Sequence, residues 1–407
     1  MPLDTRHCNT LSPELLEPQN PHLSPASAPE PFPFLDLKAQ FASIREDVME
    51  AITAVMESQH FILGDEVRLF ETEIAAMLGA KHAVSCASGS DALVLALMAA
   101  GVGTGDEVIT TPFSFIATAG SIARVGARPV FVDIDPATFN LAVDKVAAVI
   151  GPKTKAILPV HLFGLAAEMA PLVDSANEKG VPVVEDAAQA IGARYRGRYV
   201  GTIGTLGCFS FFPSKNLGGA GDGGLITTED SGLAERLRVL RVHGSKKKYH
   251  HDILGTNSRL DALQAAILRV KLKHLDEWTR GRQLRAERYR SLFGESGLDN
   301  KIQVPERPTD DFVHVYNQFT IRCRERDEVA GFLKSAGIPA EIYYPLPLHL
   351  QPAFGYLGHR ARQFPEAELA SHEVLSLPVY PELTATQQSS VVSAIASFYA
   401  GGGQNRP

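Results

Sequence analysis

The chain has no long uninterrupted run of apolar residues, although 45% of its 407 residues are hydrophobic. A helix that crosses a membrane needs about 18 or more consecutive, mostly apolar residues, so the sequence predicts no spanning segment and no membrane partner. The first residues also lack the basic and then apolar order of a secretory signal. These absences favour a cytoplasmic location.

An excess of basic charge is missing as well. The net charge is −7, and a nucleic-acid partner would require a basic face, so none is expected. There is no GxxxxGK[ST] loop for nucleotide phosphates. The glycine-rich stretch at 218–224 precedes a predicted strand, whereas a dinucleotide-binding loop would lie between a strand and a helix.

Cysteine is scarce and widely spaced, with no CxxC pair. The four residues are Cys8, Cys86, Cys208 and Cys323. Such usage suits reduced thiols in the cytoplasm. A small histidine-rich group, His243, His250, His251 and Asp252, does not have the spacing of a tetrahedral or helical ligand set, so no metal site is expected.

What the chain does contain is an alternation of short apolar runs and helical patterns. Helical spacing lies between most of the runs, as in Asp91–Ala100 and Met169–Lys179. The alternation predicts an α/β fold with a mostly parallel seven-stranded sheet flanked by helices. The predicted strands are Ala83–Ala87, Glu107–Thr111, Val130–Ile134, Ala156–Val160, Val181–Glu185, Gly207–Phe211 and Leu225–Thr228.

The domain organisation follows from changes in composition. Residues 1–31 are rich in proline and predict a disordered extension, and residues 401–407 predict a flexible tail. Residues 32–275 form the predicted large domain, which includes a helix starting at Asn257 or Ser258. Residues 276–400 form a predicted smaller C-terminal α+β domain.

Two charged residues at predicted strand ends carry the chemistry. Lys215 follows the apolar run Phe209–Phe212, and Asp186 ends the earlier run Val181–Val184. Pyridoxal phosphate needs a lysine that forms a Schiff base and an acid that holds its ring nitrogen. A single lysine after a turn is usually a surface residue. The order and spacing of this pair, with glycines nearby, favour the cofactor interpretation and assign Lys215 and Asp186 to catalysis.

A phosphate site is predicted where the first strand meets its helix. Ser88, Gly89 and Ser90 lie at this junction, where free backbone amides at a helix start bind anions. Ser210 offers a further hydroxyl. Junctions of this kind are frequent, so the stretch alone remains compatible with an ordinary helix start.

Two further residues are candidates for contact with the cofactor ring. Gln189 can donate a hydrogen bond to the ring oxygen, and Phe115 can lie flat against the ring. The alternatives, a helix-surface glutamine and a core phenylalanine, stay open. The basic stretch 246–248 is interpreted as a solvated loop, with contact to nucleotide phosphates as a second possibility.

These motifs together resemble a known family. From about Phe32 to Phe398 the chain is similar to the sugar-nucleotide aminotransferases of the DegT and StrS family, which are fold type I enzymes. A narrower likeness is to UDP-2-acetamido-2-deoxy-3-oxo-glucuronate aminotransferases. The matching stretches are 33–37, 87–93, 131–135, 185–189, 210–218 and 255–260, and for the narrower likeness 241–244, 249–251 and 347–354.

The resemblance implies a homodimer with active sites at the subunit interface and a role for each motif residue. Lys215, Asp186 and Gln189 would hold the cofactor as proposed above. Ser90, Ser210 and the backbone of Gly89 would bind its phosphate. Asn257 would contact the cofactor phosphate of the neighbouring subunit. Arg259 would contact the sugar or the amino donor there, and Tyr344 would contact the sugar.

The activity implied is transfer of an amino group from L-glutamate, which leaves as 2-oxoglutarate, to a UDP- or dTDP-linked 3-keto hexose or hexuronate. The cofactor would alternate between pyridoxal and pyridoxamine phosphate, and the amino-sugar product would enter surface polysaccharide or lipopolysaccharide synthesis. Tyr343 stands where the uronate-type members carry histidine, which leaves the C5 substituent of the sugar open.

Three alternatives remain at this point. Another fold type I enzyme, such as a decarboxylase or aldolase, shares the lysine and the acid. Dehydratases of the family carry histidine in place of the lysine, and the presence of Lys215 disfavours that branch. A non-catalytic sensor would bind the cofactor without turning over an amino donor.

Overall fold

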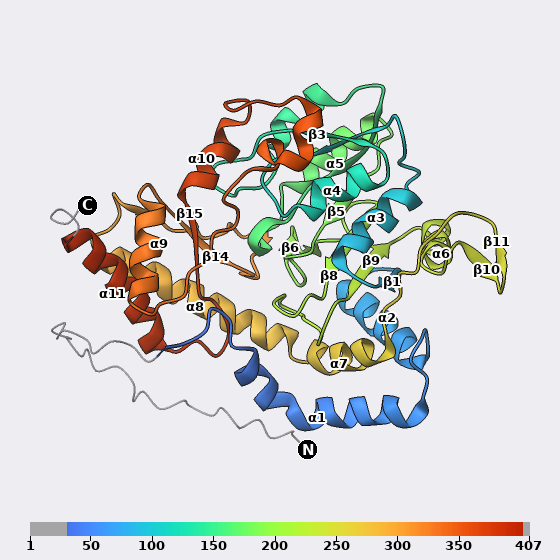
Figure 1. The fold of residues 1–407 in the computed structure, drawn as a ribbon, viewed down its shortest axis with the longest axis horizontal. Coiled ribbons are helices and arrows are strands. Elements are labelled where there is room, and N and C mark those ends of the chain that lie inside the picture. Colours follow the sequence, from blue (N-terminus) through green and yellow to red (C-terminus); the bar gives the residue numbers. More distant parts are fainter. Residues whose placement is uncertain (1–30, 402–407) are drawn as a thin grey trace, which may run out of the picture.

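The computed structural model describes residues 31–401 (Figure 1). Residues 1–30 of the predicted extension and 402–407 of the predicted tail lie outside the described residues. Within the described range, no helix combines the length and the apolar character that a membrane crossing requires. The helices are α1 (Leu37–Ser58), α2 (Asp65–Leu78), α3 (Gly89–Ala99), α4 (Ala117–Arg124), α5 (Met169–Glu178), α6 (Ser231–Leu240), α7 (Ala262–Leu272), α8 (Leu275–Glu295), α9 (Arg326–Ser335), α10 (Pro365–Glu373) and α11 (Ala385–Gly401).

The strands of the central layer match the predicted alternation. They are β1 (His82–Cys86), β2 (Glu107–Thr110), β3 (Arg128–Phe131), β4 (Thr154–Leu158), β5 (Val184–Asp186), β8 (Leu206–Ser210) and β9 (Gly224–Thr228). They pair in the orders β1-β9-β8-β5 and β3-β2-β4, and parallel bridges such as Ile157 to Val183 connect β4 with β5. Only β9 runs antiparallel to its neighbours in this layer of the described chain. The predicted mostly parallel α/β sheet is confirmed.

A second group of elements lies at one end of the molecule. In Figure 1, α8, α9 and α11 gather around β14 (Phe319–Cys323) and β15 (Val374–Leu377). β14 pairs with β15 and with β12 (Ile302–Gln303). These elements enclose a separate apolar core that also takes in Phe32. The domain boundary at residue 275 stays a prediction.

The remaining strands are short and pair outside the sheets described above. β6 (Arg194–Tyr195) pairs with β7 (Arg198–Tyr199) and with β13 (Phe312–Val313). The hairpin of β10 (Ser245–Lys247) and β11 (His250–His251) projects at the edge far from α9 and α11 (Figure 1). The 3-10 helices are η1 (Val143–Lys145), η2 (Ala147–Val149), η3 (Leu162–Gly164), η4 (Leu348–Leu350) and η5 (Pro352–Leu357).

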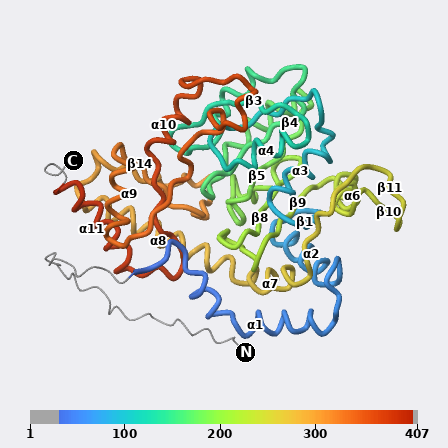
Figure 2. The backbone as a smooth tube through the Cα atoms, in the orientation of Figure 1, coloured from blue at the N-terminus to red at the C-terminus, as the bar shows by residue number. Residues whose placement is uncertain are grey.

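The expectation for the helix after residue 256 was wrong by about one turn. α7 begins at Ala262, because the preceding backbone is held extended by other segments. Asn257 forms an antiparallel bridge with Val242, and Asp261 forms one with Ile62. The backbone tube in Figure 2 shows α7 running beside α1, whose buried face includes Ile44 and Val48.

Close backbone packing at β8 generates a testable prediction. A Cβ atom at Gly207 would lie 2.1 Å from the Gly201 carbonyl oxygen, so Gly207→Ala must displace backbone. We expect this overpacking to lower the free energy of unfolding by about 1–3 kcal/mol, seen as a lower midpoint in urea denaturation. Gly103→Ala is the matched control, because nothing lies within 4 Å of its added Cβ. Equal midpoints for the two variants would contradict the packing argument.

Candidate active site

The candidate residues lie at the carboxyl ends of neighbouring strands. Asp186 ends β5, Ser210 ends β8, and Ser88 follows β1. In an open parallel sheet, ligands bind at this edge. The antiparallel strand β9 lies between β1 and β8 and starts at Gly224, which pairs with both Cys86 and Ser210. The fold therefore brings the predicted lysine, acid and phosphate motifs to one edge.

The carboxylate of Asp186 is buried and held from two sides. The Thr118 hydroxyl donates to its Oδ2 over 2.8 Å, and the Ala188 amide donates to its Oδ1 over 3.2 Å. Ser114 and Thr118 hydroxyls lie 2.8 Å apart, so Ser114 can donate to Thr118 in turn. Burial raises the pKa of Asp186, and these hydrogen bonds and Lys215 oppose the rise. Thr118 was not foreseen from sequence, since nothing in its local pattern points to Asp186.

Lys215 sits on a tight turn after β8. Its amide donates to the Phe212 carbonyl oxygen over 2.8 Å. Desolvation lowers the pKa of Lys215 from 10.5 to about 8, against an opposing pull from Asp186. The amine is therefore neutral in a large fraction of molecules at mildly alkaline pH, as a nucleophile must be.

The turn that carries Lys215 is fixed on both sides. The Asn216 side chain donates to the Val315 carbonyl oxygen over 2.9 Å and accepts from Asn317 over 2.8 Å. The buried Lys271 ammonium donates to the Gly218 carbonyl oxygen over 2.7 Å. A Cβ at Gly218 would lie 2.3 Å from the Pro213 carbonyl oxygen, so this position requires glycine.

The start of α3 forms a cradle that admits an anion. Ser88 is its N-cap and accepts a hydrogen bond from the Asp91 amide over 3.1 Å. The first amides of the helix, which belong to Gly89 and Ser90, have no partner within the helix. A Cβ at Gly89 would lie 2.6 Å from the Ser210 Cβ, so only glycine lets the helix start approach Ser210 this closely. Free amides beside hydroxyls suit a phosphate group.

A second buried pair, His161 and Glu185, lies next to Asp186. Nε2 of His161 and Oε2 of Glu185 are 2.8 Å apart, and Nδ1 of His161 accepts from the Ala167 amide. The histidine proton therefore resides on Nε2 and is donated to Glu185. Glu185 also accepts hydrogen bonds from the amides of residues 201, 203 and 204. The His161 amide donates to the Asp186 carbonyl oxygen, so this network fixes the strand end.

Gln189 and Tyr344 meet although 155 positions separate them. Gln189 accepts from the Phe163 amide over 2.7 Å and donates to the Tyr344 hydroxyl over 3.1 Å. Phe115 is 54% exposed, and its ring centroid lies 6.3 Å from that of Tyr344. The three residues thus line one side of the site, and the stacking of Phe115 on a cofactor ring stays a prediction.

Among the described residues, the recorded hydrogen bonds of the Asp186 carboxylate come from Thr118 and Ala188, and none comes from Asn257 or Arg259. The residue between them, Ser258, is buried and links their loop to α3. Its hydroxyl donates to Asp91 over 2.7 Å and accepts from the Ala87 amide over 3.2 Å. Ser258 was missed from sequence, where it stood unmarked between two candidate residues. The roles implied for Asn257 and Arg259 involve a neighbouring subunit and stay predictions.

The site fits pyridoxal phosphate by its donor set and by its shape. A desolvated lysine, a buried carboxylate and a glycine-walled anion cradle supply the three contacts that this cofactor requires. Lys215 would hold it covalently, Asp186 would face its ring nitrogen, and Gly89, Ser90 and Ser210 would face its phosphate.

The Thr118 hydrogen bond predicts weaker cofactor binding in Thr118→Val. Loss of the bond raises the pKa of Asp186 further and weakens the charge that holds the ring nitrogen. We expect the dissociation constant for pyridoxal phosphate to rise about tenfold, measured by equilibrium dialysis. Thr110→Val is the matched control, because Thr110 is also buried but donates to the Leu158 carbonyl oxygen. A change of the same size in both variants would contradict a specific role for Thr118.

The lowered pKa of Lys215 predicts the pH dependence of cofactor capture. Only the neutral amine attacks an aldehyde, and Lys215 loses its proton near pH 8. The rate at which the apoenzyme gains cofactor absorbance should rise with pH and level off above about 8. Butylamine and pyridoxal phosphate, measured over the same pH series, provide the control. A protein rate that is still rising steeply at the highest pH tested would contradict the lowered pKa.

Comparisons with known proteins agree with this geometry. The chain is 55% identical to a protein of Geobacillus stearothermophilus named pleiotropic regulatory protein, over 90% of this chain and 98% of the relative. It is 47% identical to a UDP-N-acetyl-3-dehydro-alpha-D-glucosamine 3-aminotransferase of Acidithiobacillus ferrooxidans, over 89% and 96%. It is 42% identical to a UDP-2-acetamido-2-deoxy-3-oxo-D-glucuronate aminotransferase of Pseudomonas aeruginosa, over 89% and 99%.

A solved structure and a family model extend the likeness to the fold. The structure of DesV from S. venezuelae, in complex with a ketimine intermediate, has a TM-score of 0.87 and 44% identity. The match covers 90% of this chain and 98% of that one. The model of the DegT/DnrJ/EryC1/StrS aminotransferase family matches residues 42–396. The chain therefore belongs to the DegT/DnrJ/EryC1/StrS aminotransferase family.

Proposed function

We propose that this aminotransferase moves an amino group from L-glutamate to the C3 ketone of a UDP-linked hexose. The observation that carries the proposal is the desolvated Lys215 beside the buried Asp186, next to an anion cradle at the start of α3. Enzymes of this family depend on pyridoxal phosphate. The bound cofactor supplies an electron sink for the reacting carbon.

Four side chains of the protein have separate roles in the proposed reaction. Lys215 would hold the cofactor covalently and, as a free amine, would accept and return a proton at Nζ, which its pKa near 8 allows close to neutral pH. Asp186, whose ionised form is favoured by the Thr118 hydrogen bond, would hold a positive charge on the ring nitrogen. Gln189 and Tyr344 fix each other on one wall and limit the orientations of the ring and the sugar.

The choice of a 3-keto UDP sugar rests on two relatives. Their names place the reacting nitrogen or oxo group at C3 of a UDP-linked glucosamine or glucuronate. Tyr343 stands in place of the histidine of uronate-type members, so the C5 substituent of the sugar stays open. The dTDP-linked sugars remain the alternative, and the amino sugar would serve surface polysaccharide synthesis. We place this reaction in the cytoplasm, where buried free thiols such as Cys86 and Cys208 persist.

A homodimer with shared active sites is part of the proposal. Phe115 and Phe212 flank the candidate site and are 54% and 52% exposed. On α1, Phe41, Met49 and Met56 are also exposed. An apolar surface next to a catalytic lysine is expected to be covered by another subunit. Asn257 and Arg259 would then reach the partner's site.

A second candidate function is non-catalytic sensing. The name of the Geobacillus relative, pleiotropic regulatory protein, favours it. A sensor would bind pyridoxal phosphate but form no 2-oxoglutarate from L-glutamate. A single-turnover reaction with glutamate alone therefore separates the two functions.

The function is tested by Lys215→Ala. Loss of the proton carrier should reduce turnover by at least about a thousandfold, while the circular dichroism spectrum and thermal midpoint stay near those of wild type. The assay follows 2-oxoglutarate with L-glutamate and a panel of UDP- and dTDP-linked keto sugars. Lys153→Ala, a surface substitution, is the control. Near wild-type turnover in the Lys215 variant would overturn the proposed mechanism, and no turnover of any keto sugar by wild type would overturn the proposed substrate class.

A further inference from the structure

The hydroxyl of Ser258 joins the segment before α7 to the start of α3. Ser258 is fully buried. Its hydroxyl donates to Oδ2 of Asp91 over 2.7 Å and accepts from the Ala87 amide over 3.2 Å. Asp91 belongs to the first turn of α3, and Ala87 lies in the loop before it. One buried hydroxyl therefore holds the helix start at which the cofactor phosphate is expected.

The position of Ser258 is fixed independently of α3. The Ser258 amide donates to the Arg241 carbonyl oxygen over 3.0 Å. The buried Arg241 guanidinium in turn donates to Glu71 over 2.5 Å and to the Ser85 carbonyl oxygen over 2.7 Å. Ser85 lies on β1, so these contacts tie the segment of Ser258 to the sheet. Ser258 is thus a fixed point to which the Asp91 side chain can be attached.

Residues 88–91 carry the pattern of a capping box, in which an acid in the first turn reaches back to the amide of the N-cap residue. Only half of this box is formed here, because the Ser88 hydroxyl accepts from the Asp91 amide over 3.1 Å. The Asp91 carboxylate binds Ser258 instead, and the Ser88 amide has no hydrogen-bond partner among residues 31–401. The helix start therefore keeps the free amides that a phosphate group requires.

A carboxylate that closed the capping box would oppose phosphate binding in two ways. It would occupy an amide at the helix start that is otherwise free for an anion. Its negative charge would also repel the phosphate, and this repulsion is strong at short range in a partly desolvated site. The hydrogen bond from Ser258 keeps the Asp91 carboxylate out of that place.

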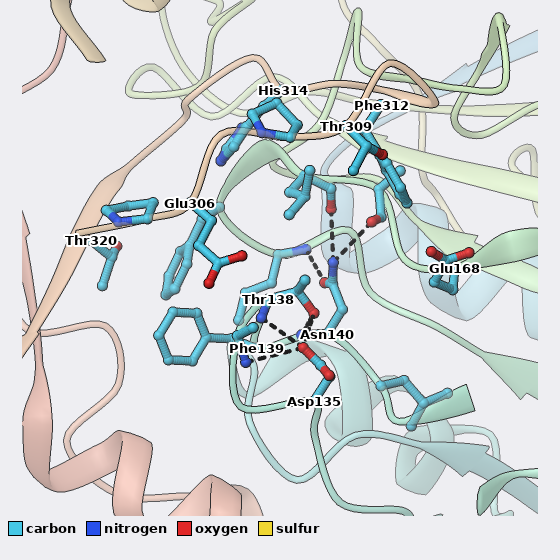
Figure 3. Close-up of a pocket in the computed structure, with 18 of the residues that line it drawn as sticks. Asp135, Thr138, Phe139, Asn140, Glu168, Glu306, Thr309, Phe312, His314 and Thr320 are labelled. Carbon is cyan, nitrogen blue, oxygen red and sulfur yellow. Dashed lines mark hydrogen bonds between the residues drawn. The ribbon is translucent and has the colours of Figure 1, made fainter. Parts of the chain in front are cut away.

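Another concave region of the chain does not suit a phosphate group. A cavity of about 350 Å³ lies between residues 135–144, residues 162–168 and residues 305–320 (Figure 3). Its lining includes four carboxylates, and Arg307 is the one arginine or lysine among its described lining residues. Arg307 is already paired with Glu287. The start of α3 therefore remains the site for the anion.

We propose that Ser258 is a positioning residue for the cofactor phosphate, and that it acts by keeping the Asp91 carboxylate away from the amides of residues 88–90. The inference deepens the proposed function and rests on its phosphate site at the start of α3. It is separate from the roles implied for Asn257 and Arg259, which concern the neighbouring subunit. Binding of a ligand with a phosphate group should depend on Ser258, whereas binding of the same ligand without the phosphate should not.

The test is equilibrium dialysis of the apoenzyme against pyridoxal phosphate and against pyridoxal, which lacks the phosphate. We expect Ser258→Ala to raise the dissociation constant for pyridoxal phosphate about tenfold, because the released carboxylate competes with the phosphate. The dissociation constant for pyridoxal should stay near that of wild type. Ser376→Ala is the matched control, because Ser376 is also fully buried but its hydroxyl pairs with Thr320, far along the chain from α3.

Substitutions of Asp91 separate the effect of its charge from other effects. Adding Asp91→Asn to Ser258→Ala should restore binding of pyridoxal phosphate, since a neutral amide does not repel the phosphate. In the otherwise unchanged chain, Asp91→Glu provides a carboxylate of the length that suits a capping box. It should bind pyridoxal phosphate about tenfold more weakly than Asp91→Gln, which has the same length without the charge.

Unchanged binding of pyridoxal phosphate in Ser258→Ala, an equal loss for pyridoxal, or a loss that persists in the double variant would overturn the proposal. If Ser258→Ala does not fold, the comparison of Asp91→Glu with Asp91→Gln decides, and equal dissociation constants would overturn it. The proposed function fails separately, when the wild-type enzyme turns over no keto sugar.

Discussion

Desolvation of opposite charges at the ends of β5 and β8 is the constraint on which the active site depends. Removal from water favours the neutral forms of both Asp186 and Lys215, and it moves their pKa values in opposite directions. Thr118 and the Ala188 amide offset this cost for the carboxylate. For the Lys215 ammonium, no hydrogen-bond acceptor is recorded among residues 31–401, and burial favours its neutral, nucleophilic form. A bound cofactor ring with a positively charged nitrogen would balance the negative charge of the buried Asp186 carboxylate.

Close backbone approach makes this arrangement possible. Gly89 allows the start of α3 to touch Ser210, and Gly224 allows β9 to pass between Ser210 and the Ser88 carbonyl oxygen. Gly218 allows the turn after Lys215 to fold back on Pro213. A methyl group at any of these positions would push apart the backbone segments that meet there. The glycines of the sequence thus determine distances at the site, and the hydrogen bonds of Asn216 and Lys271 keep the turn in place.

The two concave regions of the molecule have opposite chemistry. The strand-end site offers free amides, hydroxyls and a lysine, which suit an anionic cofactor. The cavity lined by Phe139 carries four carboxylates, those of Asp135, Asp144, Glu168 and Glu306. The segment 162–163 belongs to both, since Phe163 lines the cavity and its amide fixes Gln189.

The sequence by itself determined the α/β alternation, the identities of Lys215 and Asp186 and the glycine-rich helix start, because these features are local in the chain. It could not reveal Thr118 on Asp186, Tyr344 on Gln189 or Ser258 on Asp91, which join positions 68, 155 and 167 residues apart. It also placed the start of α7 too early, because pairing of Asn257 with Val242 overrides local helix preference. Only the tertiary structure decided these contacts and the acidic cavity, since hydrogen-bond partners, burial and charge balance depend on which distant segments the folded sheet brings together.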